Sequence, residues 1–563
     1  MPLPGPHRPA LAASVFFLAA CGSGGSATTR RIGDPADLVV YGRVWTGDSA
    51  RPWASAVAVR GDRIAAVGDS GDIARLAGPA TRVLNGGTGL VTPGLTDSHT
   101  HFIDGGLQLA SIDLRPATSP EDFVKRIKAY VSERKPGEWI LGGEWDHERW
   151  PGAPLPTRQW IDSVTPDNPV FVYRLDGHMA LANSAALRKA GIGRTMRDVP
   201  GGVVVRDASG VPTGILKDVA MGPVERVIPD PSAAQRDAAL GRAMRYAAER
   251  GVTAVCHLSV PWLDLDTYRR AHDSGRLTTR IALYLPLETW HQVADTIARS
   301  GRGDDLVWIG GVKGYMDGSL GSRTALFYQP YADDPTTAGV LRTPEDSLRA
   351  WIGAADSAGL QVAVHAIGER GNGLLLDIYD SVARAHGPRD RRFRVEHAQH
   401  LRPADVARFG RGGIIASMQP AHLIDDANWA AKRLGPGRIG HSYVLRSLLV
   451  GGATLAFGSD WSVAPMDPIL GIYAAVTRRS ADGKNPGGWV PEQKISVEDA
   501  LRAYTVGGAY AVFAEGRRGR LKPGYLADLV LLDRDLTRIP PEEIAQVKVL
   551  TTVVGGRVVF SAR

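Results

Sequence analysis

The sequence contains only two cysteines, Cys21 and Cys256, among its 563 residues. Two thiols exclude both a disulfide framework and a zinc finger built on cysteine. The net charge of +7 is dispersed, with no run of five like charges, so nucleic-acid binding is not indicated. The 66 glycines follow no fixed period, which excludes collagen, and 44% hydrophobic residues is an ordinary globular composition. Any bound metal must therefore be held by His, Asp, Glu or Lys.

The first thirty residues have the pattern of an export signal. Residues 10–20 form an uncharged stretch of about the length of a signal core, too short to span a bilayer. This stretch ends in Leu18-Ala19-Ala20-Cys21, which resembles the lipobox of bacterial lipoproteins, where the cysteine is lipidated. We predict a lipoprotein signal peptide over 1–20, lipidation of Cys21 and a flexible tether over 21–35. A plain secretory signal is the alternative.

These predictions place the protein outside the cytoplasm, anchored by lipid to a bacterial membrane on its periplasmic or cell-surface side. The sequence leaves open whether that membrane is the inner or the outer one. No other stretch is long and apolar enough to form a membrane helix.

Strand-like segments occupy both ends of the remaining chain. Residues 36–68 contain short apolar runs with a hairpin signal at Gly61-Asp62, and residues 525–560 repeat that pattern around Gly555-Gly556. The similar spacing predicts one small composite β-sandwich built from 36–89 and 515–563. Two unrelated caps are the alternative.

The middle of the chain, 90–514, alternates β-like runs with helical patterns such as those at 233–250, 344–358 and 371–385. The β-like runs are 90–99, 251–258, 280–287, 308–317, 361–366, 393–398, 413–420 and 454–461. Eight strand–helix repeats predict an α/β fold, a (β/α)8 TIM-like barrel with a parallel sheet. The segment between the first two runs is far too long for a loop, so we expect an inserted subdomain over about 103–240, at the barrel mouth.

The first barrel run ends in a pair of histidines, His99 and His101, within Asp97-Ser98-His99-Thr100-His101. Side chains alternate along a strand, so these two imidazoles point the same way, about 7 Å apart, and can chelate one ion. His-x-His is common by chance, but its position at a strand end strengthens the prediction.

Later runs carry a polar residue at or near their C-terminal ends: Lys313, His365, His397 and Asp460. Barrel enzymes build their active sites at the C-terminal ends of the strands. Taken singly, each residue has a structural explanation, such as a snorkelling lysine or a helix cap. Burying all six groups without partners would be unfavourable, so they need a common charged partner. A pair of divalent cations is the simplest one.

At this point the sequence resembles the amidohydrolase superfamily of metal-dependent hydrolases, and within it the YtcJ-like branch (amidohydrolase family 3). That branch includes enzymes acting on N-substituted formamides. The resemblance covers nearly all of the chain after the signal region. It is carried by PGLTDSHTHF (93–102), DGHMALANSAAL (176–187), GGVKGYMDGSLGSRTALF (310–327), VHAIGERGN (364–372), RVEHAQHL (394–401), AFGSDWSVAP (456–465) and GYLADLVLLD (524–533).

The resemblance implies a dinuclear metal site with a role for each matching residue. His99, His101 and Asp460 would bind the more buried ion, and His365 and His397 the second. Lys313 would be carboxylated by CO2 and would bridge both ions; burial beside cations favours the neutral amine that attacks CO2. Zinc is the first expectation, with Fe, Mn, Co or Ni as alternatives.

The implied reaction is hydrolysis of a non-peptide C–N bond in a small amide, N-acyl or formamide compound. Asp460 would accept the proton of the attacking water and pass it to the leaving amine. His178 is a candidate to polarise the substrate carbonyl, with a hydrogen-bonded turn as its alternative. Arg323 is a candidate to bind a substrate carboxylate, with a surface arginine as its alternative. His257 stands at the end of the second barrel strand, where the family often has Asp, which weakens any transfer of substrate specificity.

Three further points stay open from the sequence. The same metal site would suit a lactone or phosphoester hydrolase, and a non-catalytic substrate-binding lipoprotein is a third hypothesis, although all six ligands are present. Tryptophans 139, 145, 150 and 160 of the insert indicate either an apolar pocket wall or aromatic core packing. The oligomeric state is not determined, and a homo-oligomer is possible.

Overall fold

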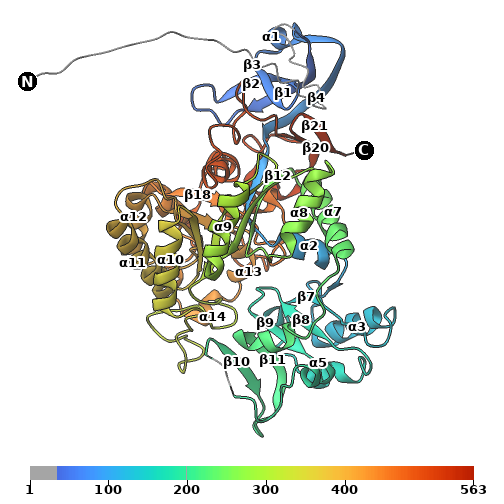
Figure 1. Ribbon diagram of the computed structural model, residues 1–563, viewed down its shortest axis with the longest axis vertical. Helices are drawn as coiled ribbons and strands as arrows, with labels where there is room; N and C mark the ends of the chain where they lie inside the picture. Colours follow the sequence, from blue (N-terminus) through green and yellow to red (C-terminus); the bar gives the residue numbers. More distant parts are fainter. Residues whose placement is uncertain (1–33, 198–199, 563) are drawn as a thin grey trace, which may run out of the picture.

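The computed structural model of the protein describes residues 34–197 and 200–562 (Figure 1). The predicted signal peptide, the predicted lipidation site Cys21 and nearly all of the tether lie outside the described residues. Within the described ranges, no helix combines the length and the apolar character needed to cross a bilayer.

The central feature is an eight-stranded parallel sheet, which confirms the predicted barrel. Its strands are β5 (Leu95–Thr100), β12 (Val252–Leu258), β13 (Arg280–Pro286), β14 (Val307–Tyr315), β15 (Gln361–Ala366), β16 (Arg394–His397), β17 (Ile415–Met418) and β18 (Thr454–Phe457). A parallel bridge between Thr100, the last residue of β5, and Trp461, shortly after β18, brings the two edge strands together. Because all eight strands point the same way, their C-terminal ends lie around one rim.

Amphipathic helices alternate with these strands and cover the barrel. The helical patterns predicted at 233–250, 344–358 and 371–385 correspond to α7 (Ala233–Glu249), α10 (Glu345–Ser357) and α11 (Glu369–His386). Ser232 starts α7 with a capping box that also uses Gln235, which satisfies backbone N–H groups of the first turn. Other helices of this layer are α8 (Asp264–Asp273), α9 (Trp290–Ser300), α12 (Pro403–Gly412) and α16 (Pro468–Thr477).

Strands from both ends of the chain pair in one sheet, in the order β21-β20-β19-β4-β1-β2-β3. These strands are β1 (Ala36–Trp45), β2 (Trp53–Arg60), β3 (Arg63–Gly68), β4 (Ala77–Pro93), β19 (Leu529–Leu532), β20 (Val549–Val554) and β21 (Arg557–Ser561). The two halves join where β4 pairs with β19, and the sheet curls so that Ile64 donates its N–H to the Tyr525 carbonyl at 2.8 Å. The predicted sandwich is thus one continuous, curled sheet around an apolar core.

The segment between β5 and β12 contains a six-stranded sheet of its own, in the order β10-β11-β9-β8-β7-β6. Its strands are β6 (Ile112–Asp113), β7 (Gly142–Trp145), β8 (Phe171–Arg174), β9 (Met179–Ala182), β10 (Gly202–Arg206) and β11 (Pro212–Asp218). Helices α3 (Pro120–Val131), α4 (Arg158–Asp162) and α5 (Ser184–Lys189) accompany the sheet. This insert lies at the opposite end of the barrel from the terminal sheet (Figure 1).

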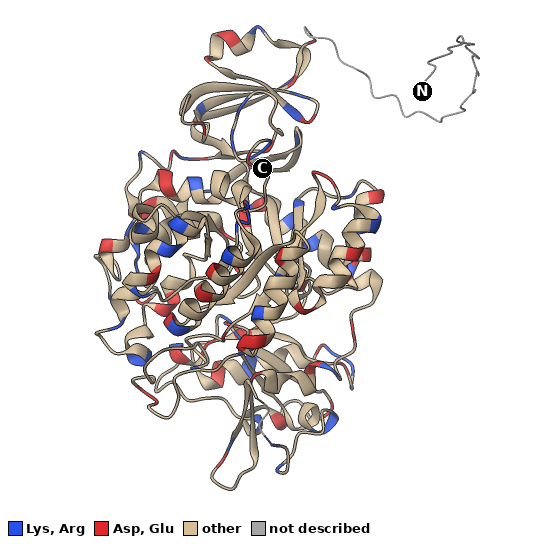
Figure 2. Ribbon diagram, turned by 60° about the vertical axis from the view of Figure 1, so that its left-hand side comes forward, with Lys and Arg blue, Asp and Glu red and all other residues tan. Residues whose placement is uncertain are grey.

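Buried ion pairs hold the insert against the barrel loops. Arg433, in α14 (Ala430–Leu434), is fully buried and pairs with Glu148 of the insert and with Asp333 of a barrel loop. Lys432 also reaches Glu148, at 3.0 Å. Elsewhere, basic and acidic residues are interspersed over the barrel helices (Figure 2).

Candidate metal centre

Three side chains from distant strands converge at the barrel rim. His99 is the second-last residue of β5 and His397 is the last residue of β16, while Asp460 follows β18. All three are buried, and one ligand atom of each lies within 4.8 Å of the others. The closest approaches are 3.4 Å from His99 Nε2 to Asp460 Oδ1 and 3.9 Å from His397 Nδ1 to Asp460 Oδ2.

The other predicted ligands surround this triad. His101 Nε2 lies 3.2 Å from the same oxygen, Asp460 Oδ1. The ring of His365 lies 4.4 Å from that of His397, between centroids, and its Nε2 is 3.1 Å from the Gly318 carbonyl oxygen. Lys313 is buried, with its Nζ 4.0 Å from the centroid of the Tyr315 ring. The structure thus gathers the six predicted residues at one end of the barrel.

The donor set fits a divalent metal ion. His99 Nε2 and Asp460 Oδ1 are buried and have no hydrogen-bond partner among the described residues. Buried polar atoms without partners are unfavourable, so both atoms need a further partner. Imidazole nitrogens and carboxylate oxygens are ligands that zinc and related ions accept.

The protonation states suit such an ion as well. Burial lowers the pKa of His99, and it lowers the pKa values of His365 and His397 well below the usual histidine value; the nearby charge of Lys313 adds to this effect at all three. Burial alone would raise the pKa of Asp460, but its interactions with His99 and His101 hold it well below the ordinary value. Neutral imidazoles and an ionised carboxylate are the forms that bind metals.

Glu396 and Gln419 orient two of these histidines, a role that the sequence analysis missed. Glu396 Oε2 lies 2.7 Å from His99 Nδ1, which leaves Nε2 of that ring for a metal. Gln419 Oε1 lies 2.8 Å from His397 Nδ1. Arg394 donates in turn to Glu396, from Nε at 2.7 Å. Such partners fix the tautomer and the orientation of a ligand, and the position of Glu396 directly before His397 was an available signal.

Two of the candidate ligands also have unusual backbone conformations. His397 has φ 76° and Asp460 has φ 58°, in the left-handed region that non-glycine residues rarely occupy. Each such residue carries a strain of about 1–3 kcal/mol and persists only where its surroundings fix it. Such residues concentrate at functional sites, which agrees with the convergence of side chains here.

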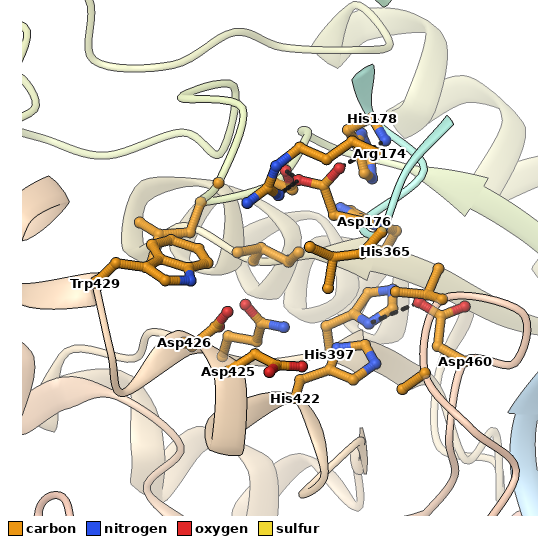
Figure 3. Close-up of a pocket in the computed structure, with 18 residues that line it drawn as sticks. Arg174, Asp176, His178, His365, His397, His422, Asp425, Asp426, Trp429 and Asp460 are labelled. Atoms are coloured by element: carbon orange, nitrogen blue, oxygen red, sulfur yellow. Dashed lines mark hydrogen bonds and ion pairs between the residues drawn. The ribbon is translucent and has the colours of Figure 1, made fainter. Parts of the chain in front are cut away.

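A pocket opens beside the candidate ligands, with His178 on its wall (Figure 3). The His178 ring lies 5.2 Å from that of His365, between centroids. Its Nδ1 is 2.6 Å from Asp218 Oδ1, so Nε2 is the remaining ring nitrogen. Burial would lower the pKa of His178, but the charge and hydrogen bond of Asp218 outweigh it and raise the pKa. The insert therefore does reach the site through this residue.

Arg323 and His257 have other partners. Arg323 donates to both carboxylate oxygens of Asp333, at 3.2 Å from Nε and 2.8 Å from Nη2, and it does not line the pocket described here. Its role in substrate binding therefore stays a prediction. His257 is buried, with Nδ1 2.7 Å from the Tyr268 hydroxyl.

The tryptophans of the insert are mainly core residues. Trp145, Trp150 and Trp160 pack with Phe123 in one apolar cluster, away from the pocket residues. Trp429, which the sequence analysis did not single out, lines the pocket instead. Aromatic core packing, the second of the two interpretations, explains these three side chains.

Comparison with known proteins shows the family to which the chain belongs. A model of the amidohydrolase family matches residues 83–560. Protein LONG AFTER FAR-RED 3 of Arabidopsis thaliana is 43% identical, covering 93% of this chain and 91% of the relative. The putative amidohydrolase YtcJ of Bacillus subtilis (strain 168) is 32% identical, covering 86% of this chain and 91% of the relative. N-substituted formamide deformylase of Arthrobacter pascens is 26% identical, covering 92% of this chain and 97% of the relative.

The fold also matches that of a solved metal-dependent hydrolase. The crystal structure of an uncharacterized metal-dependent hydrolase from Pyrococcus horikoshii OT3 matches with a TM-score of 0.72 and 28% identity, covering 90% of this chain and 99% of that one. The resemblance predicted from the motifs is confirmed. This chain belongs to the amidohydrolase family of metal-dependent hydrolases.

Proposed function

We propose that the protein hydrolyses a non-peptide C–N bond of a small amide, N-acyl or formamide compound with the help of divalent metal ions. The observation that carries this proposal is the convergence of His99, His397 and Asp460 at the barrel rim, with two orphaned ligand atoms facing one another. The similarity to an N-substituted formamide deformylase over 92% of the chain supports the choice of bond.

In this proposal His99, His101 and Asp460 would hold one ion, and His365 and His397 would hold the other. Lys313 would supply a further ligand as a carbamate, formed when its amine nitrogen adds to CO2 with the loss of one proton. Zinc is the first expectation for the metal. When bound, such ions act as Lewis acids, which lowers the pKa of water and polarises a carbonyl oxygen.

The protein's own groups then have separate tasks. Asp460 is ionised and can accept a proton from water and deliver it to the leaving nitrogen. His178 donates from Nδ1 to Asp218, and in its protonated form, which its raised pKa favours, it can also donate a hydrogen bond from Nε2 to the substrate carbonyl. Glu396 keeps the His99 ring in one orientation. The insert contributes Arg174, Asp176 and His178 to the pocket wall.

The test is elemental analysis of the purified protein followed by turnover assays on amides, formamides, lactones and phosphotriesters. We expect bound zinc or a related metal, and hydrolysis of amide-type compounds that stops when a chelator removes the metal and returns when zinc is restored. A clear preference for lactones or phosphotriesters would replace the proposed bond. Absence of turnover on every class would favour a binding protein.

We also propose that Cys21 is lipidated and anchors the exported protein to a bacterial membrane. The support is the sequence Leu18-Ala19-Ala20-Cys21 at the end of an apolar stretch. The test is incorporation of labelled palmitate in cells, compared with the variant Cys21→Ser. Label and membrane attachment that persist in the variant would contradict the proposal.

A further inference from the structure

The pocket has a wall that the candidate metal ligands do not supply. Helix α13 (His422–Asp426) and the turn after it bring Asp425, Asp426 and Trp429 to the pocket. In Figure 3, Asp426 and Trp429 lie on the left of the pocket, and His365, His397 and Asp460 lie on the right. Asp425, Asp426 and Trp429, which we name the α13 wall, have no task in the proposed chemistry.

The guanidinium of Arg174, which lies beside this wall, is already paired with other carboxylates. Arg174 is fully buried and lines the pocket, but its guanidinium donates to Asp146 and to Asp176, at 2.7 Å each. Asp176 also accepts a hydrogen bond from Ser319 Oγ at 2.7 Å. Two carboxylates around one guanidinium leave a net negative charge, so Arg174 does not neutralise the α13 wall.

The two carboxylates of the α13 wall have weak or neutral partners. Asp425 is 3.9 Å from the guanidinium of Arg115, which donates instead to Glu144 at 2.8 Å. Asp426 accepts a hydrogen bond from the neutral hydroxyl of Tyr443 at 2.7 Å. Burial raises the pKa of Asp426 to about 7 despite that hydrogen bond, and the charge of Asp425 adds to the effect. A cation placed here would favour the ionised form of Asp426.

Trp429 gives an independent indication of a ligand. Its side chain lines the pocket although the residue is only 8% exposed, and its Nε1–H is buried without a hydrogen-bond partner among the described residues. A buried indole N–H ordinarily finds an acceptor. An acceptor atom on a molecule in the pocket would supply it.

We propose that the α13 wall recognises a cationic nitrogen group of the substrate, an ammonium, amidinium or guanidinium, through Asp425 and Asp426, while Trp429 donates to an acceptor atom of the same molecule. This inference rests on the proposed function and narrows its substrate class to acylated amines with a second, basic nitrogen. The scissile bond would face His178 and Asp460, and the basic group would face α13.

The test uses three N-acetyl compounds that share a four-carbon chain and differ in its end group: N-acetyl-1,4-diaminobutane (cationic), N-butylacetamide (neutral) and N-acetyl-4-aminobutyrate (anionic). For the metal-loaded wild type, we expect kcat/KM to be highest for the cationic compound, by about tenfold over the neutral one. Asp425→Asn and Asp426→Asn should each reduce that preference. Trp429→Phe keeps an aromatic ring but removes the indole N–H, so it should weaken binding. Asp346→Asn, an exposed site on α10, removes the same charge far from the pocket and should keep the preference.

Calorimetric binding of the same three compounds separates this inference from the proposed function. If none is hydrolysed but the cationic compound binds most tightly, and this depends on Asp425 or Asp426, the inference stands while the proposed reaction fails. Should the wild type bind or hydrolyse the neutral or anionic compound equally well or better, the inference is overturned. Retention of the cationic preference in both aspartate variants, with Tm values near that of the wild type, would overturn it as well.

Discussion

His99 Nδ1 lies 2.7 Å from Oε2 of Glu396, and the residue after Glu396 is His397, a second candidate ligand. One short strand, β16, therefore supplies both the group that orients His99 and a ligand for the same site. Arg394, two residues earlier, keeps Glu396 ionised: although burial opposes ionisation, the charge of Arg394 lowers the pKa of Glu396 far below its ordinary value. This relationship makes Glu396 a positioning residue whose effect should be measurable through the metal.

Glu396→Gln should weaken metal binding by about 10- to 100-fold, because groups that orient a metal ligand typically contribute that much. Competition with a fluorescent chelator measures the metal Kd directly. Tm should fall too, since Arg394 loses its ionic partner. Glu515→Gln removes the partner of Arg392 elsewhere in the molecule and should leave the metal Kd unchanged. An unchanged Kd in Glu396→Gln would contradict the positioning role.

Lys313→Ala should lose most of the bound metal and fall in turnover by a factor of about 100 or more, because the proposed bridge between the two ions is removed. Elemental analysis and kcat together provide the measurement. Lys484→Ala, at an exposed lysine, serves as the matched control and should behave as the wild type does. Full metal content together with full turnover in Lys313→Ala would refute the bridging role.

Asp460→Asn should keep the fold, since the amide has nearly the same size, but lower kcat by about 10²–10⁴-fold because it cannot accept a proton. The measurements are kcat and Tm on protein of known metal content. A variant that keeps its metal and turns over at the wild-type rate would show that another group accepts the proton.

Glu148→Gln should lower Tm at neutral pH by breaking the contact between the insert and Arg433. Burial opposes ionisation of Glu148, yet the charge of Arg433 lowers its pKa from 4.5 to about 2. Because the folded pKa is lowered, the unfolded chain binds more protons in this window. The stabilisation is therefore complete above pH 4.5 and is lost as the pH falls toward about 2.

The lowered pKa corresponds to about 3.4 kcal/mol in the free energy of unfolding at pH 7, and solvent screening reduces this effect to roughly 2–3 kcal/mol. The difference in Tm between wild type and Glu148→Gln should consequently shrink as the pH is lowered from 5 to 3. A Tm difference that stays constant over this range would show that the ion pair contributes no pH-dependent stability. Glu133→Gln, at an exposed position of the insert, is a suitable control.

The sequence alone was sufficient to predict the barrel and the rim at which the six candidate ligands gather. Buried parallel strands appear as short apolar runs, and amphipathic helices appear as a period of 3.6 residues, so both patterns are local. Polar residues that end such runs, such as Lys313 and His365, could be assigned to one rim because parallel strands share a direction. The family motifs then indicated which of these residues to expect as metal ligands.

Only the tertiary structure decided which side chains support and surround the candidate metal ligands. Glu396 orients His99 across 297 positions of sequence, and the contact exists because the barrel sheet places β16 opposite β5. Arg323 pairs with Asp333 inside the segment that follows β14, and Trp429 lines the pocket, because of the geometry of their loops. Contacts between side chains of separate elements depend on register, sheet closure and loop geometry, none of which leaves a periodic signal in a single sequence.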